Sequence, residues 1–372
     1  MPINRSIAPF VALCFLTTPA VAAGSGNDPP NDPMPENRIE MVPVPSPVIS
    51  DVPPATSSAS VQQPMGMGAA EMGAPGLTPP GIMMGGAGTW MLGYRYSIDR
   101  MDGNLVGTRR ISDAAVLNQF MASPTDMTMQ MHMGSLMFAP TDKLALMVMV
   151  PYVIKSMDHV MGMNERFRER AKGIGDVEVS ASYSLYSRAD LRHRLLVNLG
   201  ASLPTGSINE RMGSMRQEYP MQLGSGTFAI LPGIVYLGQS APWGWGAKLS
   251  AAQQLGRNDN DYRLGNRFEA SIWGSRLVTR SISFSAGLSN EWRGNIRGAD
   301  PLLDPLDEPT KDARRQGGRR LDASLGVGLH PQIGPFRRNE FFFRVDIPVA
   351  QSLDGPQLQK RWGLQLGLQR EF

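Results

Sequence analysis

The carboxyl-terminal segment alternates large apolar residues with small or polar ones. From Trp362 to Leu368 every second residue is tryptophan or leucine, and a glycine or glutamine stands between each pair. Because successive side chains of a strand point to opposite faces, this order gives the strand one apolar and one polar face. Lipid on one side and a wet lumen on the other select this pattern. With the final Phe372, it is typical of the strand that closes an outer-membrane β-barrel.

The same two-residue period recurs earlier in the chain. Apolar residues alternate with aspartate, glutamate, serine, glycine or histidine along residues 176–185, 281–288 and 321–330. A soluble β-sandwich could contain one such strand. Several of them, with small or charged residues on one face, favour a barrel with an apolar outside and a wet inside.

We therefore predict an all-β fold, an antiparallel transmembrane β-barrel of about twelve strands in residues 88–372. The strands are expected at residues 88–97, 127–138, 144–155, 175–187, 193–203, 223–238, 243–254, 263–276, 280–292, 319–330, 339–350 and 360–372. The short connections are 139–143, 188–192, 239–242, 277–279 and 331–338, and the longer ones are 98–126, 156–174, 204–222, 255–262, 293–318 and 351–359. With the amino end in the periplasm, every short turn would lie on the periplasmic side and every long loop outside.

Aromatic residues gather near the expected strand ends. They are Trp90, Tyr94, Tyr96, Tyr183, Tyr186, Trp243, Trp245, Trp292, Phe341 to Phe343, Trp362 and Phe372. Rings at these depths form the girdles that meet the two membrane interfaces. We therefore expect the barrel to contact outer-membrane lipid and lipopolysaccharide.

The amino-terminal segment predicts export. Arg5 precedes a short apolar core, Ile7 to Leu16, and Ala20-Val-Ala22 resembles a signal-peptidase site. We predict a cleaved signal peptide at 1–22 and a disordered periplasmic arm at 23–87, which is rich in proline, methionine and glycine. No apolar run is long enough for a helical membrane span, so residence in the bacterial outer membrane would be by strands.

Composition narrows the function classes. Lysine plus arginine (36) nearly balance aspartate plus glutamate (33), which argues against a nucleic-acid partner. The single cysteine, Cys14, lies in the predicted signal peptide. None of the four histidines sits in a recognised nucleophile or metal motif, so we expect neither an enzyme nor a cofactor.

Charged residues occupy the polar phase of several expected strands. These lumen candidates are Arg95, Asp176, Glu178, Lys248, Glu269, Asp322, Arg344 and Asp346. They could line a polar permeation route or form salt-bridged ladders that narrow the pore. The ladders are favoured, because unpaired charges in a narrow barrel are costly.

Methionines are concentrated between Met83 and Met163, and thioether sulfur is a soft ligand suited to Cu(I). On the second strand we expect Thr128, Gln130 and His132 to face the lumen, which would turn the intervening methionines to lipid. On the third strand Leu146 and Val148 suit the lipid face. The candidate soft-metal site is then His132, Met147, Met149, Met157, His159, Met161 and Met163. The alternative is that methionine serves here as a flexible packing residue.

Several segments resemble a known family. They include Gly88-Thr-Trp-Met-Leu-Gly-Tyr-Arg-Tyr96, Met127-Thr-Met-Gln-Met-His-Met133, Phe138-Ala-Pro-Thr-Asp-Lys143, Leu146-Met-Val-Met-Val-Pro-Tyr152 and Gly173-Ile-Gly-Asp176. The chain resembles the outer-membrane transporter family labelled "meta-pathway of phenol degradation". The resemblance implies a proteobacterial outer-membrane barrel that passes small, often hydrophobic or aromatic compounds.

We expect a porin-like barrel for passive passage of a small solute, inserted by the barrel-assembly machinery through its carboxyl-terminal strand. The alternative is a sealed-lumen binding barrel that handles a soft metal such as Cu(I) through lumen methionine and histidine.

Overall fold

The computed structural model describes residues 86–187, 192–332 and 334–372. The predicted signal peptide and almost all of the predicted periplasmic arm lie outside these residues. Among the described residues, no helix is both long and apolar enough to span a membrane.

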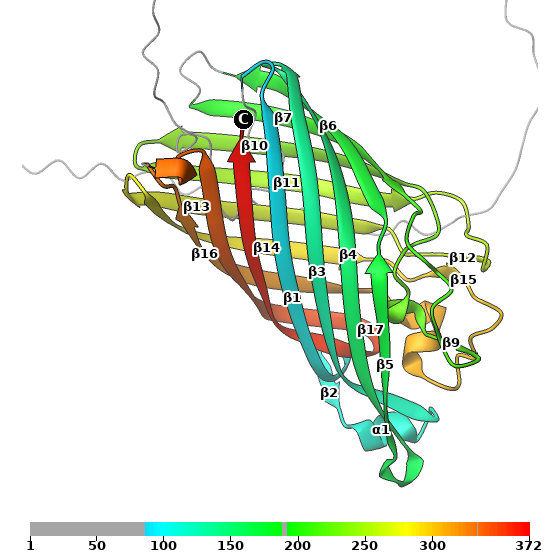
Figure 1. Ribbon diagram of the computed structural model, residues 1–372. Helices are drawn as coiled ribbons and strands as arrows, with labels where there is room; N and C mark the ends of the chain where they lie inside the picture. Colours follow the sequence, from blue (N-terminus) through cyan, green and yellow to red (C-terminus); the bar gives the residue numbers. More distant parts are fainter. Residues whose placement is uncertain (1–85, 188–191, 333) are drawn as a thin grey trace, which may run out of the picture. The chain divides into compact units, whose positions relative to one another are not determined.

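Eleven antiparallel elements close into a barrel within the described part of the chain (Figure 1). They are β1 (Trp90–Gly107), β3 (Ala122–Thr141), β4 (Leu144–Met161), β6 (Val177–Ser187), β7 (His193–Leu203), β10 (Ala229–Ser240), β11 (Trp243–Gln254), β13 (Arg267–Thr279), β14 (Ile282–Arg293), β16 (Gly318–Leu329) and β17 (Asn339–Glu371). Each pairs with the next along the chain, and β17 pairs with β1 to complete the ring.

The element β17 contributes two antiparallel strands to the barrel wall. Its first part pairs with β16, and its last part pairs with β1. Gln351 makes two hydrogen bonds with the backbone of Lys360, at 2.8 and 2.9 Å, and the Glu371 amide donates to the Arg338 carbonyl at 3.2 Å. A straight strand would hold each of these pairs far apart, so β17 folds back on itself. The barrel wall therefore consists of twelve strands, as the sequence predicts.

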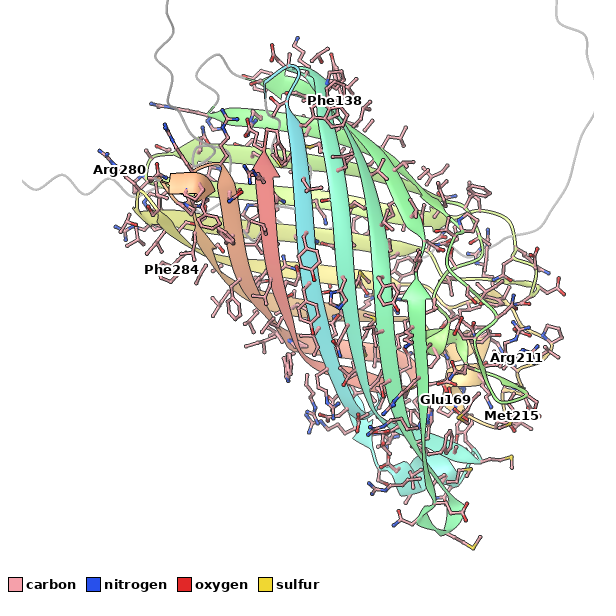
Figure 2. All side chains as sticks on the ribbon, viewed as in Figure 1. Phe138, Glu169, Arg211, Met215, Arg280 and Phe284 are labelled. Atoms are coloured by element: carbon pink, nitrogen blue, oxygen red, sulfur yellow. The ribbon has the colours of Figure 1, made fainter. Side chains whose placement is uncertain are left out.

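Inward and outward residues alternate as expected on most strands. On β16, Leu325 is 63% exposed while Asp322 is 7% exposed. Exposed apolar side chains cover the outside, including Phe284 on β14 (Figure 2). The aromatic residues Trp90, Tyr183, Trp243, Trp292 and Trp362 are also exposed, whereas Phe342 points inward.

The strands β1, β3 and β4 continue past the barrel and carry an extension (Figure 1). The extension contains β2 (Arg109–Ile111), α1 (Asp113–Leu117), η2 (Gly162–Asn164) and β5 (Arg166–Ile174). On β5 the residues Arg166, Arg168 and Arg170 are exposed, so this part of β4 and β5 lies beyond the membrane. Residues 156–174 were predicted to form a loop, and this prediction is wrong, because β5 pairs with β4.

The remaining short elements lie in connections. They are β8 (Arg211–Met212), β9 (Met215–Arg216), η3 (Tyr219–Met221), β12 (Tyr262–Arg263), β15 (Arg297–Gly298), η4 (Pro309–Lys311), η5 (Ala313–Arg315) and η6 (Gly334–Phe336). All but η6 belong to long connections. We call the barrel end with these long connections the loop end, and the opposite end the turn end.

Candidate functional site

A polar cavity of about 300 Å³ lies against the inner faces of β1, β11, β13, β14, β16 and β17. Six of the eight predicted lumen residues line it, namely Arg95, Lys248, Glu269, Asp322, Arg344 and Asp346. Asp99, Glu291, Arg320 and Lys360 line it as well. Asp99 points to the same face of β1 as Arg95. It was not among the predicted lumen residues, because that strand was predicted to end at residue 97.

The cavity charges form ion pairs. Lys248 lies 3.0 Å from Glu269, and Arg344 lies 3.1 Å from Asp346. The Lys360 ammonium reaches Asp99 at 2.7 Å and Asp322 at 4.0 Å, and Arg320 contacts Asp322 at 2.9 Å. Five cationic and five anionic side chains line the cavity: Arg95, Lys248, Arg320, Arg344 and Lys360 against Asp99, Glu269, Glu291, Asp322 and Asp346. The cavity is therefore polar but close to neutral overall.

Two predicted lumen residues do not line this cavity. Asp176 accepts hydrogen bonds from the Gly206 amide at 3.0 Å and from the Ser225 amide and hydroxyl at 2.8 and 2.6 Å. It thus holds both ends of the connection between β7 and β10 against the wall. Glu178 faces inward on β6, in the phase of the buried Ser182.

The predicted orientation of β3 is wrong. The His132 Nδ1 atom is hydrogen bonded to the Tyr94 hydroxyl at 2.8 Å, and Tyr94 is 48% exposed on the outside. His132 also lies 5.0 Å from Tyr96 between ring centroids. These groups form an outward cluster in which the His132 ring and the Tyr94 hydroxyl are hydrogen bonded to each other. Residues 127, 129, 131 and 133, all methionine, consequently face the lumen.

Two rows of methionine cross the inner wall of β1, β3 and β4. In one row Met91 pairs with Met137, which pairs with Met147. In the other row Met101 pairs with Met127, which pairs with Met157. Directly paired side chains on one face have Cβ atoms about 5 Å apart.

Each row belongs to an apolar cluster. The turn-end cluster consists of Met91, Met137, Ala145, Leu196, Val235, Leu237 and Trp273, with Met147 packed against it. The loop-end cluster consists of Met127, Val153, Met157, Ala171, Met221 and Leu223, with Met101, Met129, Met131 and Leu358 packed against it. Near the loop end the lumen thus has an apolar side centred on β3 and β4, and the polar cavity is centred on β14 and β16, whereas the turn-end cluster extends from β1 to β13.

The residues of the predicted soft-metal site do not form one cluster. His132 faces outward, so it cannot join Met147 and Met149 on the inner wall. Met147 and Met157 belong to different clusters. Met161 is partly buried, and Met163 is 96% exposed at the tip between β4 and β5.

His159 lies in a buried cluster of acidic residues under the loops. Its Nε2 atom is 3.3 Å from a Glu308 oxygen and 3.6 Å from a Glu218 oxygen. Burial lowers the pKa of His159, but these carboxylates outweigh burial and raise that pKa to about 10. Burial and the charge of Glu218 raise the pKa of Glu169, on β5, to about 9. None of the three glutamates was predicted as a site residue, because Glu218 and Glu308 lie in connections without a period and Glu169 lies in the segment 156–174 that was predicted to be a loop.

Residues 204–227 and 295–316 contact each other at the loop end, and we call these two segments together the loop cap. Tyr219 packs edge-on against Tyr262 with ring centroids 4.9 Å apart, and its hydroxyl accepts a hydrogen bond from the Asp300 amide at 3.0 Å. The Lys155 ammonium donates to the carbonyls of Pro220 and Gln222 at 2.8 and 2.6 Å. The cap is therefore bound both to itself and to β4.

The family model described as "Putative MetA-pathway of phenol degradation" matches residues 112–306, which is more than half of the chain. The chain belongs to this family. The resemblance found in the sequence is therefore confirmed.

One of the matching solved structures shares the fold of this chain. An outer-membrane channel from Pseudomonas putida F1 is 14% identical with a TM-score of 0.56, over 80% of this chain and all of the channel. More distant matches are a FadL homologue from Pseudomonas aeruginosa (12% identity, TM-score 0.37, 76% and 90% of the two chains) and the toluene transporter TbuX from Ralstonia pickettii (10% identity, TM-score 0.37, 78% and 90%). A comparison with curated proteins gives no significant match.

Proposed function

We propose that this barrel is a passive outer-membrane channel for a small solute that carries both an apolar, for example aromatic, part and a polar group. The observation that carries the proposal is the two-sided lumen. Methionines on β1, β3 and β4 offer soft apolar contacts, and the opposite wall offers paired charges and serines. The family description, which refers to phenol degradation, agrees with such a solute.

The two sides suit different parts of one molecule. An aromatic ring against the methionine wall gains apolar and sulfur–aromatic contact. A hydroxyl or carboxylate on that ring can exchange partners with the ion pairs of the cavity, which keeps the polar group hydrogen bonded along the way. A sugar of similar size gains little from the methionine wall.

Liposome swelling with the purified full-length protein tests this proposal. We expect hydroxybenzoate at pH 8 to enter faster than glucose, and the Met131→Gln plus Met133→Gln variant to lower that preference about fivefold, which corresponds to ~1 kcal/mol of apolar contact. His132→Gln is the matched control, because this residue lies between the two methionines but faces outward. Equal entry of both solutes, or equal loss in the control, would refute the proposal.

A second candidate function, soft-metal binding, is favoured by the two rows of three methionines. Three thioethers on neighbouring strands suit Cu(I), and their geometry differs from the cluster expected from the sequence. Titration with Cu(I) tests it: Met137→Leu and Met127→Leu remove the central sulfur of each row and keep an apolar side chain. Saturable binding should fall in these variants and persist in Met163→Leu, where the side chain is exposed.

A further inference from the structure

The buried cluster under the loop cap joins four separate segments. His159 comes from the end of β4, Glu169 from β5, Glu218 precedes η3, and Glu308 precedes η4. His159 and Glu218 are fully buried, and Glu169 and Glu308 are nearly so. Ionisable side chains are rarely buried at this density unless each is paired or coordinates a metal.

Hydrogen bonds within the described residues do not account for this cluster. Both carboxylate oxygens of Glu218 and the His159 Nε2 atom are buried without a hydrogen-bond partner. The separations of 3.3 and 3.6 Å from Nε2 to Glu308 and Glu218 exceed the usual length of a charge-assisted hydrogen bond, about 2.8 Å. Buried polar atoms that have no hydrogen-bond partner are costly.

A metal ion explains the spacing. Ligand atoms from His159, Glu218 and Glu308 all lie within 4.8 Å of one another. In a tetrahedral zinc site with bonds of about 2.1 Å, neighbouring ligand atoms are roughly 3.4 Å apart. The observed separations of 3.3 and 3.6 Å fit the edges of such a tetrahedron.

The charges point to a divalent cation. A divalent cation would take the place of the protons that His159 and Glu169 hold in the metal-free cluster, because with both groups deprotonated the three glutamates and the Lys311 ammonium, which lies 3.4 Å from Glu308, carry a net charge of −2. One imidazole nitrogen with carboxylates is a ligand set that suits zinc, whereas calcium takes six to eight oxygen ligands. The His159 ring is held in place by stacking on Phe167, with centroids 4.6 Å apart.

We propose that His159, Glu218 and Glu308 bind one divalent transition-metal ion of the zinc type, with Glu169 as a fourth carboxylate beside them. The ion would fasten both parts of the loop cap to β4 and β5. It is a hard-ligand site at the loop end, separate from the methionine rows and from the polar cavity. It therefore does not depend on which solute the lumen passes.

Zinc binding by the purified full-length protein tests this site. After EDTA treatment and buffer exchange in detergent, calorimetric titration should show one saturable Zn²⁺ site per chain. Glu218→Gln should weaken binding at least tenfold, because even the loss of a residue that only supports a zinc ligand weakens binding about tenfold or more. Glu210→Gln, on the same loop but outside the cluster, is the matched control and should bind as the unmodified chain does.

Trypsin provides a second readout, because Arg211 and Arg216 lie in the fastened loop. Zinc should slow cleavage there in the unmodified chain and in Glu210→Gln, but not in Glu218→Gln or Glu308→Gln. Retained heat-modifiable migration on a gel shows that each barrel has folded. Three results would overturn the proposal: no saturable zinc binding, equal binding in Glu218→Gln, or displacement of zinc by a hundredfold excess of Ca²⁺. An absence of saturable zinc binding would mean that protons alone balance the charges of the cluster.

Discussion

At the scale of single residues, Asp176 shows how one side chain can position a whole loop. From the sequence, Asp176 was predicted to line the lumen at the opening of a strand, Gly173-Ile-Gly-Asp176. Its role as an anchor could not be predicted, because its partner Ser225 is 49 residues away and lies in a connection without a period. Gly206 and Gly224 lie so close together that a Cβ atom on either would contact the backbone of the other.

Replacing Asp176 by alanine should release this loop. The change leaves the buried amides of Gly206 and Ser225 without an acceptor, and each unsatisfied donor costs about 1–3 kcal/mol. We expect tryptic cleavage after Arg211 to be at least about tenfold faster, which corresponds to ~1.4 kcal/mol. Glu178→Gln, two residues away and without a role in holding the loop, should leave the cleavage rate unchanged. Equal rates in the two variants would contradict the anchoring role.

At the scale of elements, β3 shows what alternation can and cannot predict. The period fixes which residues share a face, but it does not say which face is outside. Thr128, Gln130 and His132 were assigned to the lumen because polar residues usually face it. The register decides the orientation: Arg95 on the inner face pairs with Met133 and Tyr96 pairs with His132, so His132 lies outward, where the Tyr94 hydroxyl is hydrogen bonded to its ring nitrogen.

The loop cap also belongs to the scale of elements, and Tyr219 makes its central contacts. Tyr219→Ala removes a ring packed against Tyr262 and the acceptor for the Asp300 amide, a loss of about 3–5 kcal/mol by comparison with buried aromatic truncations. We expect higher conductance in planar bilayers, because Met221 of the cap packs against the lumen-facing Met127 and Met157 at the loop end. Tyr219→Phe keeps the ring and loses only the hydroxyl, so its conductance should stay near that of the unmodified chain. If Tyr219→Ala is cleaved faster by protease but conducts equally, the cap does not limit passage.

At the scale of the whole barrel, the strand count and the closure of the ring follow from the sequence. Short and long connections alternate along the chain, and this order alone predicts twelve membrane-spanning strands. Two of them are the two parts of β17. The cavity network was only partly predictable. Arg95 and Asp322 were found by their phase, but pairs such as Lys360 with Asp99 join the two ends of the chain and depend on ring closure.

The last strand is where closure of the whole barrel can be tested. The Phe372 amide donates to the Trp90 carbonyl at 2.9 Å, and Glu371 pairs with Met91, so the final residues complete the ring at the turn end. Arg370 interrupts the apolar phase, but its guanidinium lies 5.1 Å from the centre of the Phe372 ring. The ring thus covers the charge while remaining exposed to the interface.

Phe372→Ala removes this cover and the aromatic end, and we expect a several-fold lower yield of heat-modifiable barrel in outer-membrane fractions. Phe372→Trp should retain the yield. Because the backbone hydrogen bond to Trp90 survives in both variants, refolding in detergent should be nearly unchanged. Loss confined to cells would therefore assign Phe372 to assembly, whereas an unchanged outer-membrane yield would remove that role.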